Sequence, residues 1–480
     1  MVVFMDGFSD YTNLSDKWII SGESYPPVLT PGAGRFGSGA MDFTNSSNVD
    51  KALRGVPPMI NCIFGFAFQW RGGGNYGICG FSSNSNVFLG LWVDAGGHLS
   101  FQPNGLQAYD YVLTANTWHY CEIKVSVGYM NPNPSLGQRG GSLECRMDGQ
   151  VIMTSSNIDT EQGSGGQLDA VTIGGFVFGE TNYNYAESYV SDVYVINSIT
   201  QNWQANHVYG VNDMIIDSNG NIQACTQSVS PYLSGSSAPS WNTTPGQTTT
   251  DNNITWICVG PQTLSVVNDY LGPIKITTLM PIGNGGVQQG TSEISSWAAN
   301  TVMAVGNTIE DSNSNIQRVS SITGNAETGA TAPTWKTSVG QFTTDNNVTW
   351  ECLGAFASGA FNMVNEVPPD GDMSYRQLNA ASQIDLFTFA TPGSSDVIKA
   401  VGEWVQARTD AAGTTSIRTE VSSGGTSGDN GSDLYLSTQY ADYFADMSLD
   451  PHTQAFWTTA NLILALEGAS SGGFGYKRTQ

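Results

Sequence analysis

The chain has 480 residues, and its 41 acidic side chains against 17 basic ones give a formal net charge of −24. An acidic surface of this kind excludes nucleic-acid binding through phosphate neutralisation and disfavours binding to anionic membranes. Charged residues make up only 12% of the chain and glycine is abundant, so we expect an all-β protein of strands joined by turns, with neither nucleic acid nor membrane as a partner.

The first ten residues, MVVFMDGFSD, contain no basic stretch followed by a long apolar one, so we expect no secretory signal. No apolar run reaches the roughly 20 residues that a membrane-spanning helix needs. The seven cysteines are odd in number and include no Cys-x-x-Cys pair, which argues against a disulfide framework and a zinc ribbon. These features predict a protein made in a cytoplasm with reduced thiols.

Residues 1–198 contain short alternating runs, such as VFLGLWVDAGGHLSFQ and TWHYCEIKVSVG, separated by turns of Gly, Asn and Ser. This pattern predicts an antiparallel β-sandwich. The order of the phrases DGFSDY, GRFGSGAMDF, WHYCEIKV and DVYV resembles the concanavalin A-like lectin and glucanase fold in its laminin-G-like form. The resemblance implies a jelly-roll sandwich over residues 1–198.

The same region lacks the carboxylate strand of retaining glucanases with this fold, Glu-x-Asp-x-x-Glu. Glu187 and Asp192 differ in spacing and parity, so we expect them on opposite faces of a strand. The four histidines are His98, His119, His207 and His452, and they are too scattered for a triad or a metal site. We expect a structural role for His119, which follows Trp118. We therefore expect no catalytic residues, no enzyme activity and no cofactor, although acidic loops leave Ca²⁺ at the sandwich rims open.

A shift of 94 residues aligns Trp203 with Trp297 and continues without a gap to Gly260 and Gly354, with about half of the positions identical. We define module 1 as residues 199–262 and module 2 as residues 293–355. Each module is predicted to contain a hairpin that turns at Asp-Ser-Asn, and we interpret the Asp217 segment as this turn and not as a calcium loop.

Module 1 resembles the small chitin-binding-type modules of carbohydrate-binding families five and twelve. The matching residues are Trp203, Ala205, Tyr209, Asp213, Pro239 and Trp241. Module 2 has the expected Gly306 but carries Met303 and Asn307 where the pattern has Tyr and Asp. The resemblance implies glycan binding, for which the candidates are Tyr209, Tyr232, Trp203, Trp241, Trp297 and Trp335.

An alternative for the tryptophans is that Trp203, Trp241 and Trp256 form the core of a very small domain, because all three recur in module 2. We favour this interpretation, with Trp256 and Cys258 on one inward face of a strand. The tyrosines at 209 and 232 differ between the modules, so we expect them at the surface.

Residues 263–292 and 356–480 are expected to form a second β-sandwich, interrupted by module 2, with one helix at about 453–466 that begins after Asp450-Pro451. Phrases such as VNEVPPDGD and DPHTQAFWTTANLILALEG resemble the C-terminal region of virion structural proteins of tailed bacteriophages. The matching residues include Leu271, Gly272, Pro281, Asp385, Phe387, Asp450, Trp457 and Gly468. The resemblance implies that both modules are insertions into surface loops of a scaffold.

Together these features predict a non-enzymatic structural protein on the virion of a tailed phage. Its expected partners are other virion proteins, copies of itself (a trimer in a fibre) and cell-surface glycans, which its lectin-like modules would bind weakly and multivalently. Placement as a capsid decoration or collar part and placement in a tail fibre both stay open. The alternatives are a tailspike-type glycan depolymerase with accessory modules and a secreted bacterial adhesin, the latter disfavoured by the absent signal.

Overall fold

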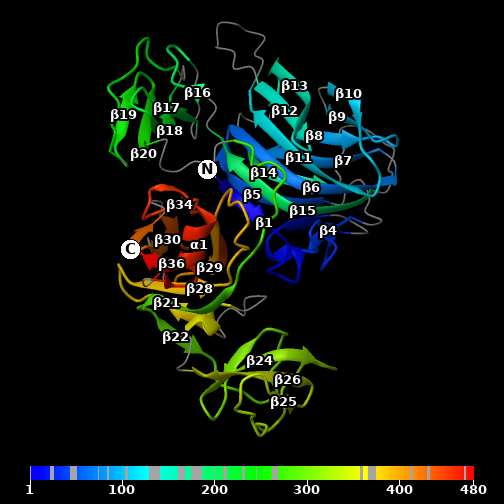
Figure 1. The fold of residues 1–480 in the computed structure, drawn as a ribbon, viewed down its shortest axis with the longest axis vertical. Coiled ribbons are helices and arrows are strands. Elements are labelled where there is room, and N and C mark those ends of the chain that lie inside the picture. Colours follow the sequence, from blue (N-terminus) through cyan, green and yellow to red (C-terminus); the bar gives the residue numbers. More distant parts are fainter. Residues whose placement is uncertain are drawn as a thin grey trace. The chain divides into compact units, whose positions relative to one another are not determined.

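The computed structural model describes residues 2–21, 26–43, 51–73, 75–83, 86–102, 106–128, 141–160, 168–174, 186–198, 201–207, 209, 213–229, 233–244, 246–261, 269–356, 360–365, 374–410, 415–429, 433–469 and 472–480. It confirms the all-β fold class, with 54% strand and 4% helix (Figure 1). The chain divides into two compact units, Met1–Ser9 with Asn13–Thr278 and Asp10–Thr12 with Leu279–Gln480. Within the described ranges, no helix is long and apolar enough to span a membrane.

Two antiparallel sheets form the sandwich of the first unit. The eight-stranded sheet consists of β13 (Gln150–Ile158), β12 (Gly141–Met147), β11 (Thr117–Ser126), β6 (Asn61–Gly73), β15 (Ala186–Asn197), β4 (Ala40–Asp42) and β3 (Val28–Thr30), with β1 (Val2–Asp6) paired to β15. The seven-stranded sheet consists of β10 (Leu106–Val112), β9 (His98–Gln102), β8 (Asn86–Val93), β7 (Tyr76–Ser83), β14 (Leu168–Gly174), β5 (Lys51–Met59) and β2 (Ile19–Ser21). A short 3-10 helix, η1 (Leu14–Asp16), precedes β2.

Alternation along β6 and β11 decides which side chains face the sandwich core. Phe64 lies opposite Ile123 in the ladder and packs edge-on against Phe81 of the seven-stranded sheet, with ring centroids 6.1 Å apart. The residues that share a strand face with Phe64 on β6 and with Ile123 on β11 therefore point into the core between the two sheets. The residues of opposite parity on β11, which include Tyr120 and Glu122, lie on the other side of the eight-stranded sheet, which we call the outer face.

The two modules form sheets that share the order of four strands, and module 1 adds a fifth strand at one edge. Module 1 contains β16 (Gln201–Asn202), β17 (Met214–Ile216), β18 (Asn221–Ser228), β20 (Ile254–Pro261) and β19 (Thr248–Asp251), in that spatial order. Module 2 contains β23 (Thr308–Glu310), β24 (Asn315–Ile322), β26 (Val348–Ala355) and β25 (Phe342–Asp345). The hairpin interpretation of the Asp217 segment is confirmed, because β17 pairs antiparallel with β18 and Asp217 Oδ1 accepts the backbone N–H groups of Asn219 and Asn221.

The second unit is built on a six-stranded sheet of β21 (Pro281–Gln288), β28 (Ile384–Phe389), β36 (Gly473–Arg478), β30 (Ser416–Ser423) and β31 (Thr426–Asp429), with β32 (Leu434–Tyr435) paired to β30. Three two-stranded ladders accompany it: β22 (Thr291–Ile294) with β27 (Ser374–Gln377), β29 (Gly402–Ala407) with β33 (Ala441–Asp446), and β34 (Leu449–Asp450) with β35 (Ala455–Phe456). A 3-10 helix, η5 (Ala360–Met363), follows module 2.

The helix α1 spans Thr459–Leu466 and begins later than the predicted residue 453. Thr458 is its N-cap and accepts the backbone N–H of Asn461 at 3.2 Å. Upstream, β34 and β35 pair across a tight turn, so the Asp450-Pro451 step starts a turn and not the helix. The predicted apolar stripe does form, since Leu462 and Leu466 join Trp457 in one buried cluster.

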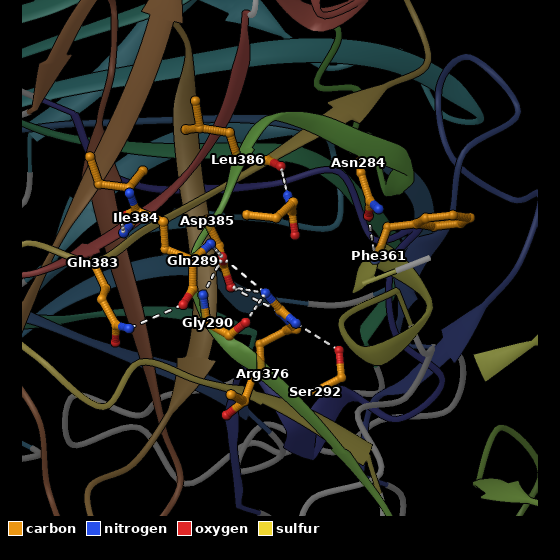
Figure 2. A network of polar contacts seen from close by, with 12 residues as sticks. Asn284, Gln289, Gly290, Ser292, Phe361, Arg376, Gln383, Ile384, Asp385 and Leu386 are labelled. Carbon is orange, nitrogen blue, oxygen red and sulfur yellow. Dashed lines mark hydrogen bonds and ion pairs between the residues drawn. The ribbon is translucent and has the colours of Figure 1, made fainter. Parts of the chain in front are cut away.

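The segment that carries module 2 is fixed at its base (Figure 2). The strands that lead into and out of it, β22 and β27, pair antiparallel from Thr291 with Gln377 to Ile294 with Ser374. Arg376 of β27 forms a buried ion pair with Asp385 of β28 at 2.8 Å and donates to Ser292 Oγ at 2.6 Å. The two ends of this segment therefore lie side by side in their own two-stranded ladder, which Arg376 connects to β28 of the six-stranded sheet.

The first boundary of the expected C-terminal sandwich is placed differently in the structure. We assigned residues 263–292 to that domain, but the described residues up to Thr278 belong to the first unit. The reason is a set of hydrogen bonds from residues 271–276 to the outer face of the eight-stranded sheet.

Candidate functional site

The tryptophans of both modules surround a buried carboxylate. In module 1, Asp251 Oδ2 accepts the indole N–H of Trp203 at 2.7 Å and that of Trp256 at 3.2 Å, and its Oδ1 accepts the backbone N–H of Gly235 at 2.7 Å. In module 2, Asp345 accepts the equivalent groups, namely the indole N–H of Trp297 at 2.8 Å, that of Trp350 at 3.2 Å and the backbone N–H of Gly329 at 2.8 Å. One polar network thus holds the core of both copies.

The burial of the tryptophans agrees with the core interpretation. Trp256 and Trp350 are fully buried, as is Cys258 beside the first of them. Trp241 and Trp335 are also buried and pack edge-on against these rings, with centroids 6.0 and 5.9 Å apart.

The remaining two tryptophan candidates differ from these. Trp203 and Trp297 are half-buried and border the apolar clusters, so part of each indole faces solvent. Among the described glycan-binding candidates, these two keep exposed aromatic surface.

The surface position expected for Tyr209 is wrong. Its side chain is 0% exposed, its ring packs edge-on against Trp256 with centroids 4.9 Å apart, and its hydroxyl accepts the backbone N–H of Gln204 at 2.8 Å. Met303 occupies the equivalent core position of module 2 and is 5% exposed. The two copies can differ at this position because either a tyrosine or a methionine side chain fills the space in the core. The other tyrosine candidate, Tyr232, lies outside the described residues.

The outer face of the eight-stranded sheet carries a polar row that the sequence reasoning missed. The ladder places Arg146 of β12, Glu122 of β11, Gly65 of β6 and Tyr194 of β15 side by side. A Cβ at Gly65 would come within 2.1 Å of the Tyr194 ring, so the glycine lets the tyrosine lie across β6. The Tyr194 hydroxyl donates to Glu122 Oε1 at 2.5 Å.

Asp192 extends this row at an irregularity of β15, where its backbone has a φ of +51° between register-shifted neighbours. Ser191 Oγ donates to Asp192 Oδ2 at 2.9 Å, and the hydroxyl of Tyr120 donates to the backbone carbonyl of Asp192 at 3.1 Å. The ring of Tyr120 stacks on that of Tyr194, with centroids 6.5 Å apart. Arg35 lies over the Tyr120 ring at 5.3 Å from its centroid.

A short segment, residues 269–278, lies on this row, and we call it the strap. The backbone N–H of Leu271 donates to Tyr194 Oη at 3.2 Å, and that of Gly272 donates to Glu122 Oε1 at 2.8 Å. The backbone N–H of Ile276 donates to Asp192 Oδ1 at 2.8 Å. The strap is therefore held mainly by its backbone donors, on acceptors that the sheet supplies.

Burial controls the protonation of the outer face. Burial raises the pKa of the Glu122 carboxyl above its usual value, although the hydrogen bonds from Tyr194 and Gly272 oppose this. Burial likewise raises the pKa of Asp192, against hydrogen bonds from Ile276 and Ser191. The pKa of Tyr194 is raised by burial and by nearby Tyr120 and Glu122. The face thus combines carboxyls that hold a proton to higher pH with neutral tyrosine hydroxyls.

The histidines do not form a site in the described ranges. His119 Nδ1 lies 2.8 Å from Asp148 Oδ2, and its Nε2 accepts the backbone N–H of Thr114 at 3.3 Å, so both ring nitrogens are engaged by the protein. This agrees with a structural role. Across the residues that the structure describes, no three His, Cys, Asp or Glu side chains gather as metal ligands.

No family model matches the chain, and none of the curated proteins matches it. Among solved structures, the alginate lyase Aly36B matches with a TM-score of 0.28 and 10% identity, over 40% of this chain and 95% of its own. The alginate lyase vAL-1 from a Chlorella virus matches with a TM-score of 0.30 and 13% identity, over 41% and 99%. Domain 4 of AbnA, a GH43 extracellular arabinanase from Geobacillus stearothermophilus, matches at 0.26 and 8%, over 41% and 93%. Scores this low carry no argument about substrate or mechanism.

These matches nevertheless correct one expectation. We expected the chain not to be an enzyme, whereas the solved structures that it resembles include enzymes, two alginate lyases among them. The exclusion rested on the missing Glu-x-Asp-x-x-Glu strand. That strand marks one glucanase mechanism, and a sandwich scaffold can carry other catalytic side chains, so its absence does not exclude catalysis.

Proposed function

We propose that this chain is a glycan-interacting protein whose two modules act as repeated binding units on a β-sandwich scaffold. The observation that carries the proposal is the duplication. Both modules keep one network around Asp251 and Asp345, and each places a half-buried indole, Trp203 or Trp297, at the edge of its core. Weak sites that occur twice in one chain gain affinity for a repeating polymer, because the second contact is intramolecular.

The outer face of the sandwich adds side chains of the kind that bind sugars. Aromatic rings, carboxyl acceptors and guanidinium donors lie next to one another there, in Tyr120, Glu122 and Arg146. Polar groups that converge beside aromatic surface are typical of small-molecule sites. We therefore include this face in the proposed glycan interaction.

We further propose that the protein is displayed on the particle of a tailed phage, in a capsid, collar or tail-fibre position, as a homo-oligomer among other virion proteins. The resemblance of the C-terminal phrases to phage virion proteins supports this placement. The close pairing of β22 and β27 at the base of module 2 also supports it, since an inserted display unit needs adjacent ends. Labelling of particles with antibody against the chain tests it, and a chain absent from particles would contradict it.

A second function, cleavage of the bound glycan, is favoured by Glu122. Its buried carboxyl has a raised pKa and lies 2.5 Å from the hydroxyl of Tyr194, beside the guanidinium of Arg146. A carboxyl with a raised pKa keeps its proton to a higher pH and can donate it to a leaving group, and a nearby cation can stabilise developing negative charge. In this structure the strap covers these groups.

The test uses the full chain with a panel of neutral and acidic polysaccharides. Binding is measured by affinity electrophoresis, and cleavage by new reducing ends and by the ultraviolet absorbance of unsaturated uronates. We expect at least one polysaccharide to retain the wild-type protein. The double variant, Trp203→Phe with Trp297→Phe, should be retained about tenfold more weakly than either single variant. The aromatic control is Phe456→Ala, an exposed residue of the second unit. Unchanged mobility on every polysaccharide sinks the proposal.

A further inference from the structure

The strap forms no strand pairing in the described part of the chain, yet its backbone is fixed at three points. The N–H groups of Leu271, Gly272 and Ile276 donate to the outer face. Gly272 has a φ of +77°, a conformation that glycine adopts without strain. In these three hydrogen bonds the donor belongs to the strap and the acceptor to the sheet. Sugar hydroxyls can supply the same donors to the same acceptors.

The one aromatic side chain of the strap covers cationic groups of the sheet. The ring of Tyr270 lies 3.8 Å from the guanidinium carbon of Arg146 and 5.8 Å from the ammonium of Lys124, measured to the ring centroid. Nε of Arg146 donates to Glu144 Oε1 at 2.7 Å, so removal of the Tyr270 ring uncovers the other N–H groups of this guanidinium together with the ammonium of Lys124. Two cations on neighbouring strands suit a ligand with carboxylate groups.

A third cation of the outer face has an unused donor. Nη1 of Arg35 is buried without a hydrogen-bond partner in the described structure, while the guanidinium lies over the ring of Tyr120. A buried guanidinium N–H that the protein leaves unbonded is costly unless a ligand or water satisfies it. This donor therefore marks a further position at which the outer face can bind an anionic group.

We propose that the strap occupies a groove for an acidic oligosaccharide, which binds the outer face when the strap leaves. Arg146 and Lys124 then bind carboxylates, while Glu122 and Tyr194 bind hydroxyls. The proposal deepens the proposed glycan interaction and rests on it. Only molecules with a displaced strap can bind the ligand there. The apparent affinity is therefore the intrinsic affinity multiplied by the fraction of molecules whose strap is displaced.

The experiment compares the full-length protein with its Tyr270→Ala variant. Trypsin cleavage after Lys275, an exposed residue of the strap, reports strap release, and calorimetric titration with oligogalacturonate reports binding. We expect faster cleavage at Lys275 and about tenfold tighter binding of oligogalacturonate, with no gain for neutral chito-oligosaccharide. The control is Tyr435→Ala, a 60% exposed tyrosine of the second unit.

A second variant, Gly272→Pro, removes the N–H donor to Glu122, leaves the Tyr270 ring in place and keeps the Lys275–Ile276 bond that trypsin cleaves. Release of the strap in either variant without a gain in oligogalacturonate binding overturns the proposal. Unchanged cleavage in both variants also overturns it, because the strap is then a fixed part of the sandwich. The modules distinguish failure of the groove from failure of the proposed function. If the wild type binds oligogalacturonate and the double variant Trp203→Phe with Trp297→Phe does not, the modules bind the glycan, and only the groove is rejected.

Discussion

Asp251 and Asp345 hold equivalent places in the two modules, and each carboxylate accepts two indole N–H groups and one backbone N–H. Each is almost fully buried, at 2% and 3% exposure. A buried carboxylate is stable only where charge-assisted hydrogen bonds replace its water. The carboxylate and its three donors therefore act as one unit in each module.

Asp251→Ala is expected to destabilise module 1 by about 3 kcal/mol, because it leaves buried indole and backbone donors without an acceptor. Asp345→Ala should do the same in module 2. Since the two carboxylates lie in separate cores, the effects should add in the double variant. Urea unfolding followed by tryptophan fluorescence measures both. Asp396→Ala, an exposed aspartate, is the control. A midpoint for Asp251→Ala equal to that of this control contradicts the prediction.

Tyr209→Met is expected to cost less than about 1.5 kcal/mol, because Met303 already fills the equivalent core position of module 2. Tyr209→Ala should cost about 3–5 kcal/mol, since it opens a cavity against Trp256. Thermal unfolding of the two variants gives the comparison. Equal losses for Met and Ala would show that the hydroxyl bond to Gln204, and not ring volume, dominates at this position.

The sequence predicted the parts of the fold that depend on local pattern. Alternation placed Trp256 and Cys258 on an inward strand face, and both are buried. The Asp217 turn followed from its residue types, and the hairpin is present. The prediction for Tyr209 is wrong because a difference between the two copies does not indicate exposure: Tyr209 and Met303 are unlike side chains of similar bulk, and each fills the same core position. The start of α1 was misplaced because Asp450-Pro451 resembles a helix start, while Thr458 makes the cap.

The outer face could not be predicted because it depends on register between distant strands. Glu122 and Tyr194 meet only because β11 and β15 both flank β6 and share Gly65 as a ladder partner. The parity of β11 shows that Glu122 faces away from the core, but not that a segment 150 positions later donates to it. One signal was present in the sequence: a glutamate directly between Cys121 and Ile123, two apolar residues, indicates a specific partner.

Arg376→Ala is expected to destabilise the second unit by about 3–5 kcal/mol, because it leaves Asp385 as a buried charge without its ion-pair partner. The matched control is Arg408→Ala, whose ion-pair partner Asp410 is 69% exposed, so this ion pair should be worth less than about 1 kcal/mol. Chemical unfolding measures the loss. Proteolysis between β22 and β27 should also be faster in Arg376→Ala, since the base of module 2 is anchored there. Resistance equal to the control would show that strand pairing alone holds the base.

The second unit should lose stability as the pH rises above about 4.5, through Glu403 and Glu420. Oε2 of each is buried without a hydrogen-bond partner in the described residues. Burial and then the charge of Glu420 raise the pKa of Glu403 well above the usual 4.5. Burial also raises that of Glu420, with Lys477 opposing and Asp429 adding to the shift.

A carboxyl with a raised folded-state pKa binds more protons folded than unfolded, so its stabilising effect is complete below pH 4.5 and falls as the pH rises through the folded-state pKa. Glu403→Gln keeps the side chain neutral at every pH. We therefore expect the melting temperature of Glu403→Gln to fall less than that of the wild type between pH 4.5 and 8. The difference between the two slopes of unfolding free energy against pH should correspond to about one proton. The control is Glu467→Gln, an exposed glutamate of the same unit. Parallel pH profiles for Glu403→Gln and wild type would exclude a contribution of proton binding by Glu403.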